Sequence, residues 1–405
     1  MNQEEIICLI ERGFETSTLQ FKVTINNINQ LSQEMVAFSN TLGGILVIGV
    51  TDEGKVHGLS GDEIRKINQW IGSASTELIK PPISPLTDVI QINGKNVLVV
   101  EIRQGASKPY YTNEGISYIK KGSDKRIAPP EEILRMFQES GKIYADETII
   151  RNSSAEDIDE NIFKEFIYNK FFGQRSGVAV SLQEFLQLPM SNALEMIKVN
   201  APLETVLKNM VFSDGNNLTL AGLMLFGKNP QHFKPMFTVQ CVSYAGNDIA
   251  GTHFRDSQPP YEGNLKMLFE NAMTFLKRNL RYVQVQESFN SLGELEIPQA
   301  TLEELLVNSL VHRDYYIDST VKVLMFDNRI EIVSPGKIPN SLTIENIING
   351  QSIPRNPIIH SNAQFLLPYR GLGSGIPRAL RNYKNIEFVN DESGGQFKAI
   401  IYRAG

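Results

Sequence analysis

Glu304, Asn308 and His312 are spaced four residues apart in the chain. In a helix this spacing aligns the three side chains along one stripe. Leucines form an apolar face on the same segment, and Val307 and Val311 flank the stripe, so we expect a helix buried on both sides. A buried carboxylate and a buried amide need partners. They could satisfy each other and nearby backbone groups, or offer a base and a hard oxygen ligand to a bound group.

A glycine-rich segment, RGLGSG at 370–375, precedes a second expected helix. Backbone N–H groups at the start of a helix attract phosphate oxygens, so a turn containing Gly371, Gly373 and Gly375 could cradle a phosphate. Glycine-rich turns are common in proteins. This segment therefore indicates a phosphate site only in combination with the polar stripe.

The elements that must position these residues follow from apolar spacing. The expected helices span 3–12, 27–40, 263–281 and the segment carrying the stripe. The expected strands span 15–23, 45–50, 96–103, 116–122, 236–246, a hairpin around the turn Asp327-Asn328, and 397–403. Residues 155–230 have a mainly helical pattern. These elements predict an α+β fold.

The polar stripe resembles the N-box of the GHKL-type ATPases, the class of gyrase, Hsp90, histidine kinases and MutL. The resemblance implies that Asn308 binds Mg²⁺ on ATP, that Glu304 activates water, and that His312 adjoins the nucleotide. In that class the aspartate of a D-x-G motif reads adenine. This chain has Ser334 and Gly336 there, so the adenine-reading carboxylate is missing. The sequence leaves three alternatives open: the site binds ATP, it binds and hydrolyses ATP, or it has degenerated and no longer binds ATP.

The surrounding segments resemble one subgroup more closely. They are HRDYY at 312–316, DNRIEIVSPGKIP at 327–339, PRNPII at 354–359 and RGLGSGIPRAL at 370–380. Together they resemble the C-terminal ATPase-like domain of proteins often labelled RecG-like helicases or transcriptional regulators. The resemblance implies a GHKL-like α/β sandwich over about residues 295–390.

The N-terminal part has a second set of related segments. Glu15 and Gln20-Phe21-Lys22 precede SNTLGGILVIGVTDEGKVHGL at 39–59, and YIKKGSDKRIAPPEEI follows at 118–133. This combination resembles the Schlafen AlbA-like domain of bacterial regulators and Schlafen proteins over roughly residues 10–135. The same order of two domains occurs in that family of regulators, so the two resemblances support each other. They imply nucleic-acid binding.

The same resemblance raises an enzymatic alternative. Some Schlafen-type domains are RNA endonucleases in which three acidic residues hold a divalent metal. By motif position these residues are Glu15, Gln20 and Asp52 here, and the middle one is an amide. Two carboxylates should hold Mg²⁺ or Mn²⁺ more weakly than three. An ordinary turn role for Asp52 is the other interpretation, since Asp-Glu-Gly favours a turn.

Five cations are candidates for phosphate contacts in this domain: Lys22, Lys120, Lys121, Lys125 and Arg126. Such contacts are independent of base sequence and sensitive to salt. The whole chain has a formal net charge of −6, so a local patch would have to do this work. A solvated loop is the alternative interpretation of this charge run.

Several classes of protein are excluded. No G-x-x-x-x-G-K-[ST] segment occurs, so the chain has no Walker A loop for a helicase motor. The HRD at 312–314 lacks the asparagine that a kinase needs, since position 319 is serine. No apolar run is long enough for a membrane span, no signal-peptide pattern is present, and two distant cysteines fit a reducing cytoplasm.

We therefore predict three parts: an AlbA-like nucleic-acid-binding domain at 1–140, a mainly helical middle region at 141–290 that could contain a winged-helix-like unit, and a GHKL ATPase-like domain at 291–405. The predicted function is a cytoplasmic transcriptional regulator that binds DNA in preference to RNA. Its C-terminal domain binds ATP and Mg²⁺ or keeps a degenerate ATP site. A metal-dependent RNA endonuclease and a non-catalytic scaffold are the alternatives. We expect a homodimer, because both domain types often pair.

Overall fold

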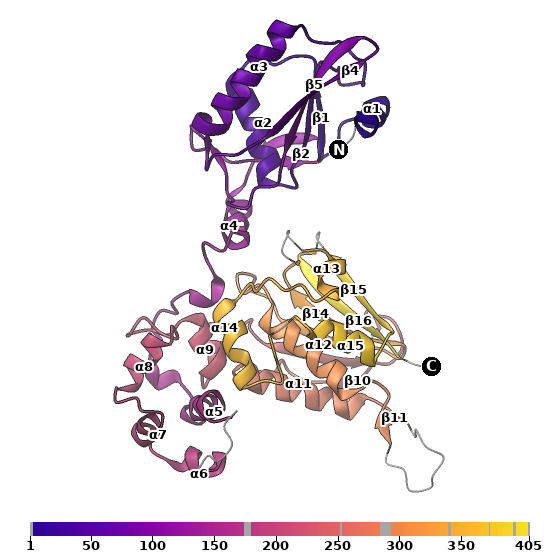
Figure 1. Ribbon diagram of the computed structural model, residues 1–405. Coiled ribbons are helices and arrows are strands. Elements are labelled where there is room, and N and C mark those ends of the chain that lie inside the picture. The colour runs from indigo at the N-terminus through magenta and orange to yellow at the C-terminus, as the bar shows by residue number, and fades with distance from the viewer. Residues whose placement is uncertain are drawn as a thin grey trace. The chain divides into compact units, whose positions relative to one another are not determined.

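The computed structural model describes residues 3–173, 180–251, 253–283, 293–338, 342–371, 373–391 and 394–403. The fold mixes helices and sheets, so the predicted α+β class is confirmed. The chain forms two compact units, unit 1 (Met1–Ile143) and unit 2 (Tyr144–Gly405), both drawn in Figure 1. Among the helices that the structure describes, none has the length and apolar composition needed to cross a bilayer.

Unit 1 is built on a four-stranded sheet in the order β1-β2-β5-β4. Its strands are β1 (Leu19–Lys22), β2 (Gly44–Ile48), β4 (Leu86–Ile92) and β5 (Lys95–Ile102). Strands β1 and β2 run parallel, and the other neighbours run antiparallel. A parallel pair needs a crossover connection, which helix α2 (Ile28–Asn40) provides.

Both faces of this sheet are covered by apolar packing. Leu46 and Ile48 pack toward α2 and helix α3 (Gly61–Ser73), whereas Val47 belongs to the core that includes helix α1 (Gln3–Glu11). This alternation follows from the two-residue period of a strand. The expected strand over 45–50 is therefore a central strand with a core on each side.

The remaining elements of unit 1 place its cationic segment. They are η1 (Ala74–Leu78), β3 (Ile79–Lys80), β6 (Tyr111–Thr112), β7 (Tyr118–Lys121), β8 (Asp124–Ile127) and α4 (Pro130–Glu139). Strands β7 and β8 form a hairpin. The buried Asn40 donates to the carbonyls of Tyr110 and Tyr118, both at 2.9 Å, and so fixes this hairpin against the end of α2.

Unit 2 begins with short helices, as expected for the middle of the chain. They are η2 (Ala145–Glu147), η3 (Ala155–Asp157), α5 (Glu160–Phe171), α6 (Leu182–Gln187), α7 (Met190–Met196), α8 (Leu203–Asn209), α9 (Leu220–Phe226) and α10 (Pro230–Phe233). Asp159, Ser181 and Thr219 cap α5, α6 and α9 through their side chains. Every residue of α9 is buried, which makes it the central helix of this part. The winged-helix-like unit stays a prediction.

A six-stranded sheet in the order β10-β9-β13-β14-β16-β15 forms the rest of unit 2. Its strands are β9 (Val239–Tyr244), β10 (Phe254–Ser257), β13 (Val321–Met325), β14 (Arg329–Pro335), β15 (Ile386–Asp391) and β16 (Gln396–Tyr402). Two-residue strands β11 (Tyr282–Val283) and β12 (Glu294–Leu295) pair with each other. The predicted hairpin around Asp327-Asn328 is the β13–β14 pair.

The sheet joins segments that the sequence assigned to two different domains. Strand β9 lies before residue 290 and pairs in parallel with β13, with Cys241 opposite Val323. Their crossover includes helices α11 (Leu265–Asn279) and α12 (Gln299–Val311). One hydrophobic core runs through all of these elements. The structure thus continues one unit across the expected division at 290–291, while its unit boundary at 143–144 lies close to the expected one at 140.

Helices α11, α12 and α15 (Gly375–Asn382) contribute to the main core, and Figure 1 shows α12 and α15 close together beneath β14 and β16. Residues Val242 and Leu324 form a smaller apolar cluster with Tyr244 and Phe326. The C-terminal part is therefore a two-layer α/β sandwich, as the sequence predicted. Helices α13 (Ile344–Ile348), α14 (Pro357–Asn362) and η4 (Ala363–Phe365) connect β14 to the glycine-rich segment.

Candidate functional site

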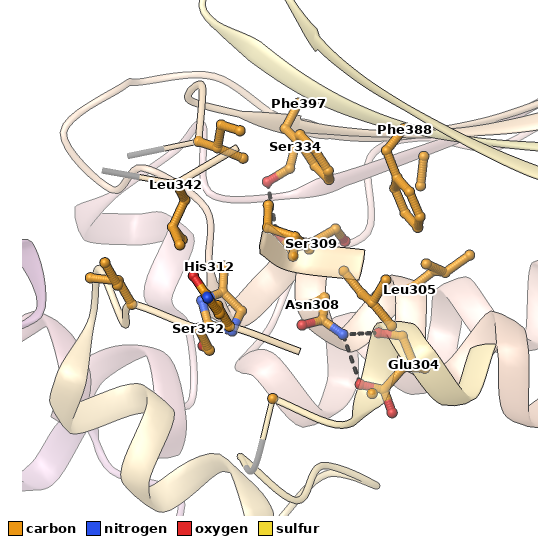
Figure 2. A pocket seen from close by; sticks show the side chains of 18 of the residues that line it. Glu304, Leu305, Asn308, Ser309, His312, Ser334, Leu342, Ser352, Phe388 and Phe397 are labelled. Atoms are coloured by element: carbon orange, nitrogen blue, oxygen red, sulfur yellow. Dashed lines mark hydrogen bonds between the residues drawn. The ribbon is translucent and has the colours of Figure 1, made fainter. Parts of the chain in front are cut away.

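A pocket lies between α12, α15 and the sheet of unit 2 (Figure 2). The residues that the sequence assigned to a nucleotide site all line it: Glu304, Asn308, His312, Ser334, Gly336, Gly371, Gly373 and Gly375. They come from a helix, a strand end and a glycine-rich turn that are separated in sequence. The fold therefore brings the predicted residues together, and their roles toward a ligand stay predictions.

The Glu304 carboxylate is held on both of its oxygens. The Asn308 side-chain amide donates to Glu304 Oε1 at 2.8 Å and to the Glu304 carbonyl at 2.6 Å (Figure 2). Arg378 of α15 donates from Nη2 to Glu304 Oε2 at 2.6 Å. Sequence reasoning missed Arg378, although it lies in the quoted segment 370–380. Its position three residues after Gly375 was the available signal, because residues i and i+3 share a helix face.

Two glycines allow the close packing around this pocket. A Cβ atom at Gly375 would collide with the Glu304 carboxylate, so α15 can approach α12 only with glycine at this position. Gly336 has φ +97°, and a Cβ there would lie 2.5 Å from both Arg355 Nη1 and Asp314 Cβ. The glycines of SPG and RGLGSG therefore have structural reasons in this fold, which are compatible with contact to a ligand.

Ser334 occupies the position where the resemblance calls for aspartate. Its hydroxyl donates to the Ser309 carbonyl of α12 at 2.8 Å, and the residue is buried. The pocket wall beside it is apolar and includes Ile332, Phe388 and Phe397. The two phenylalanine rings stack with centroids 5.9 Å apart and planes 11° apart. This end suits a planar aromatic group and offers it a neutral hydroxyl oxygen.

His312 contributes a neutral ring to the pocket wall. Its Nε2 atom lies 2.9 Å from the Tyr369 hydroxyl. Burial lowers the pKa of His312 to about 3, with a further contribution from His360 and Arg355. Burial also raises the pKa of the Tyr369 hydroxyl. His312 therefore presents no positive charge to a phosphate near neutral pH.

The HRD and PRN segments hold the floor of the pocket together. Arg355 pairs with Asp314 at 2.8 Å and donates to the Lys337 carbonyl at 2.6 Å. The Asn356 amide donates to the Arg313 carbonyl at 2.9 Å. These contacts join three of the segments that carried the family resemblance, so HRD has a structural role here.

The charges around the pocket favour an anion. Its cationic lining residues are Lys337, Arg355, Arg370 and Arg378, and Arg355 is paired with Asp314. Among the described lining residues Glu304 is the only carboxylate, and Arg378 neutralises it. The pocket thus combines an apolar wall with several cationic lining residues.

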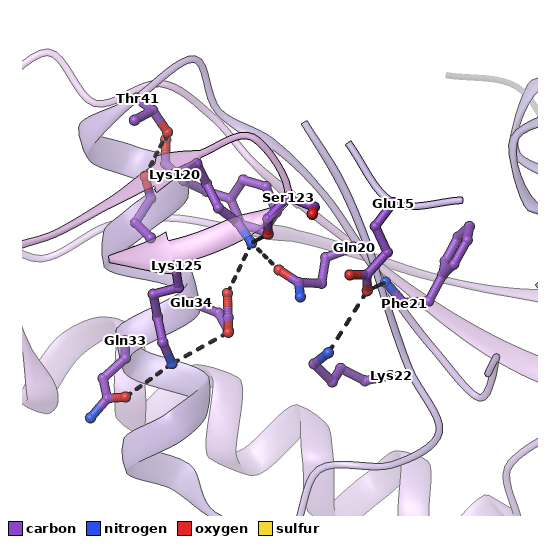
Figure 3. A network of polar contacts seen from close by, with 12 residues as sticks. Glu15, Gln20, Phe21, Lys22, Gln33, Glu34, Thr41, Lys120, Ser123 and Lys125 are labelled. Atoms are coloured by element: carbon purple, nitrogen blue, oxygen red, sulfur yellow. Dashed lines mark hydrogen bonds and ion pairs between the residues drawn. The ribbon is translucent and has the colours of Figure 1, made fainter. Parts of the chain in front are cut away.

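Unit 1 places Lys120 inside the protein (Figure 3). Its side chain is completely buried, and Nζ forms an ion pair with Glu34 Oε2 at 3.2 Å. It also donates to the Ser123 carbonyl at 3.0 Å and to Gln20 Oε1. Burial lowers the pKa of Lys120, and Glu34 opposes this change. Three protein oxygens therefore already surround the Lys120 ammonium, and its phosphate contact stays a prediction.

The other predicted cations differ in their exposure. Lys125 lies 3.3 Å from Glu34 Oε1 and keeps 20 % of its side chain exposed. Lys121 and Arg126 are exposed on the β7–β8 hairpin, and Arg126 pairs with Asp124 at 2.8 Å. Lys121 and Arg126 are thus the cations of this group that reach solvent freely.

The residues of the nuclease alternative have separate neighbours. Glu15 Oε1 accepts from the Phe21 backbone at 2.9 Å and lies 3.8 Å from Lys22 Nζ. Gln20 is turned to Lys120 (Figure 3). Asp52 is exposed on a turn. In the part of the chain that the structure describes, no three His, Cys, Asp or Glu side chains are grouped to hold a metal. The nuclease triad therefore gains no support from this geometry.

Two family models match the chain. The Schlafen AlbA_2 model matches residues 15–129. The model described as "Putative ATP-dependent DNA helicase recG C-terminal" matches residues 318–401. The chain combines a Schlafen AlbA_2 domain with a RecG-related ATPase-like domain. Both family resemblances drawn from the sequence are thus confirmed. Helix α12 precedes the second match, so the fold is what adds Glu304 and Asn308 to the RecG-related residues.

No curated protein matches the chain. A crystal structure of the DIP2311 protein from Corynebacterium diphtheriae is similar over 99 % of this chain and 79 % of that chain, with 17 % identity and a TM-score of 0.48. A solution structure of the N-terminal domain of a "Putative ATP-dependent DNA Helicase RecG-related Protein" from Nitrosomonas europaea is similar over 31 % of this chain and 88 % of that chain, with 18 % identity and a TM-score of 0.23. Neither likeness bears on function.

Proposed function

We propose that this protein is a nucleotide-responsive regulator that binds nucleic acid through unit 1 and a nucleoside triphosphate through the pocket of unit 2. The observation that carries the proposal is the convergence of the predicted nucleotide residues in one pocket that has an apolar wall and cationic lining residues. The chain has no Walker A loop, so nucleotide binding serves regulation and not translocation.

The pocket fits a nucleotide in three respects. Phe388 and Phe397 provide an apolar wall for a base. Lys337 and Arg370 add positive charge to the lining of the pocket. Helix α15 begins at Gly375 without a side-chain cap, so its first N–H groups suit phosphate oxygens. Each feature is weak alone, and their presence in one pocket supports the proposal.

Asn308 would hold Mg²⁺ that accompanies the nucleotide. Its amide nitrogen is used by Glu304, which turns the amide oxygen toward the remaining space, and an amide oxygen is a suitable hard ligand. A bound Mg²⁺ would neutralise phosphate charge. Glu304 is tied to Asn308 and Arg378, so its carboxylate must be released before it can accept a proton from water. We therefore propose binding with slow or no turnover.

Unit 1 would bind the sugar–phosphate backbone through Lys121 and Arg126, with Lys22 as a further partner because 34 % of its side chain is exposed. Such contacts carry no base specificity. We propose DNA as the partner in preference to RNA, a role in transcription, and a homodimer. Fluorescence anisotropy with labelled duplex DNA and single-stranded RNA tests this part. Equal weak binding to both at low salt, unchanged in a Lys121→Ala/Arg126→Ala variant, would reject it.

A thermal-shift titration with ATP and Mg²⁺ tests the nucleotide site. A ligand that binds the native state alone stabilises it by about 2.7 kcal/mol at 100 times its Kd. We expect this shift in the wild type and its loss in Asn308→Ala. Asn192→Ala is the matched control, because Asn192 is exposed on α7 and does not line the pocket. No shift in the wild type with any nucleoside triphosphate would overturn the proposed site.

A further inference from the structure

We infer that Arg378 senses the phosphates of the bound ligand: its guanidinium pairs with Glu304 and turns to a terminal phosphate when a nucleotide enters. This inference rests on the proposed nucleotide site and adds its regulation. Arg378 and Glu304 both line the pocket, on α15 and α12 respectively. Their ion pair is the contact that a phosphate would have to replace.

The two partners differ in freedom. The Glu304 side chain is 7 % exposed and the Arg378 side chain is 37 % exposed. Glu304 is further fixed by Asn308, and Gly375 packs directly against its carboxylate. The Arg378 guanidinium lies at the end of a long, flexible side chain that lines the pocket. The guanidinium is therefore the partner that can move, while the carboxylate stays in place.

The guanidinium also has unused capacity. Its described hydrogen bond to Glu304 comes from Nη2 alone, so the described ion pair is monodentate. A guanidinium has five N–H donors and binds phosphate through two parallel bonds, which is the stronger arrangement. A phosphate at the start of α15 would thus compete with Glu304 for Arg378 on favourable terms.

The competition separates ligands by charge. A nucleoside such as adenosine has no phosphate and gains nothing from Arg378. ATP and ADP gain a charge-assisted contact, but to obtain it their phosphate must replace Glu304 as the partner of Arg378. Weakening Glu304 as an acceptor should therefore tighten ATP binding, although Glu304 belongs to the pocket. This effect is opposite to what loss of an ordinary binding residue would produce.

Isothermal titration with ATP, ADP and adenosine, each with Mg²⁺, tests the inference. Arg378→Met should weaken ATP and ADP binding by about tenfold or more, as loss of a charged hydrogen bond does, and leave adenosine unchanged. Glu304→Gln should tighten ATP binding about threefold to tenfold. Arg381→Met is the matched control, because Arg381 is exposed on the same helix and does not line the pocket.

The double variant Glu304→Gln/Arg378→Met decides between sensing and structure. The double variant removes both charges of the pair and leaves no unpaired carboxylate. We therefore expect it to fold even if Arg378→Met alone does not. It should bind ATP as weakly as Arg378→Met, because the gain from Glu304→Gln requires Arg378. Equal ATP affinity in Arg378→Met and the wild type overturns the inference, as does a parallel loss of adenosine. A wild type that binds none of the three ligands overturns the proposed function itself.

Discussion

Units 1 and 2 each contain a carboxylate, an amide and a cation in one polar cluster, but the two cations are held differently. In unit 1, Lys120 is completely buried and contacts Gln20, Glu34 and a backbone carbonyl. In unit 2, Arg378 keeps 37 % of its side chain exposed and has one described partner, Glu304. The first cation is enclosed by protein oxygens, and the second borders an open pocket.

The difference shows which of two similar clusters can respond to a ligand. Displacing Lys120 would strand a charge in the interior, which costs several kcal/mol. Moving Arg378 exposes a group that already touches solvent, and a phosphate can take the place of Glu304. The cluster in unit 1 therefore stabilises the fold, and the cluster in unit 2 can exchange partners.

The largest expected effect is on the stability of unit 1. Lys120→Met removes the buried ammonium between Glu34 and Gln20, so we expect a loss of about 3 kcal/mol in the free energy of unfolding. Arg378→Met should cost less, about 1 to 2 kcal/mol in unit 2, because the guanidinium that it removes is 37 % exposed, although the buried Glu304 carboxylate then keeps only the bond from Asn308. Urea denaturation followed by circular dichroism measures both.

Lys121→Met serves as the control for Lys120→Met, because Lys121 is its exposed neighbour on the same strand. It should leave the midpoint of denaturation unchanged. Similar losses in Lys120→Met and Arg378→Met would show that the two cations are held alike, and the contrast between the clusters would be wrong.

An intermediate effect is expected on the pH dependence of unit 2, which contains both Asp146 and His312. Burial raises the pKa of Asp146 from 3.8 to about 6, so its stabilising contribution is present at low pH and is lost as pH rises through 6. Burial lowers the pKa of His312 from 6.5 to about 3, so its contribution is present above pH 6.5 and is lost as pH falls. Between about pH 7 and 5 the two changes oppose each other.

Asp146→Asn removes one side of this balance. We expect the variant to lose roughly 1 to 2 kcal/mol more stability than the wild type on acidification from about pH 7 to 5. The amide oxygen can still accept from Ile358 and Ile359, as Asp146 Oδ2 does at 2.7 and 2.9 Å. His312→Gln should lose less than the wild type over the same range. The same slope in all three proteins would refute the assignment of these two groups.

The smallest expected effect concerns the choice of base. Ser334 offers a neutral oxygen, whereas a carboxylate would bind an exocyclic amino group more strongly. We expect the wild type to bind ATP and GTP within about tenfold of each other, and Ser334→Asp to raise the preference for ATP about fivefold to tenfold. Competition binding measures the ratio. A strong preference for ATP in the wild type would place adenine recognition on other residues.

Much of the fold followed from local patterns. Helix α2, the buried strand β2, helix α12 and the β13–β14 hairpin match the expected segments, because their apolar spacing and turn residues act over a few positions. The polar stripe of Glu304 and Asn308 could be read for the same reason. Strand β15 was not expected, since its pairing with β16 depends on residues beyond its own segment.

What the sequence did not reveal concerns contacts between distant segments. The charged run around Lys120 has the composition of a solvated loop, and only its contacts with Gln20 and Glu34, far away in sequence, bury it. Arg378 was passed over because its partner Glu304 lies on another helix. Such pairings are properties of the assembled fold and leave no local pattern in the sequence.

The parallel pairing of β9 with β13 has a consequence for how this protein can be divided and inherited. A fragment starting at residue 291 would lack β9 and α11, so it would expose the unpaired edge of β13 and part of the core beneath it. The family match at 318–401 therefore marks the recognisable residues and is smaller than the piece that can fold. Genetic exchange of the pocket would have to carry β9 and α11 together with the strands that follow them, and a junction at 143–144, between the two compact units, cuts no sheet.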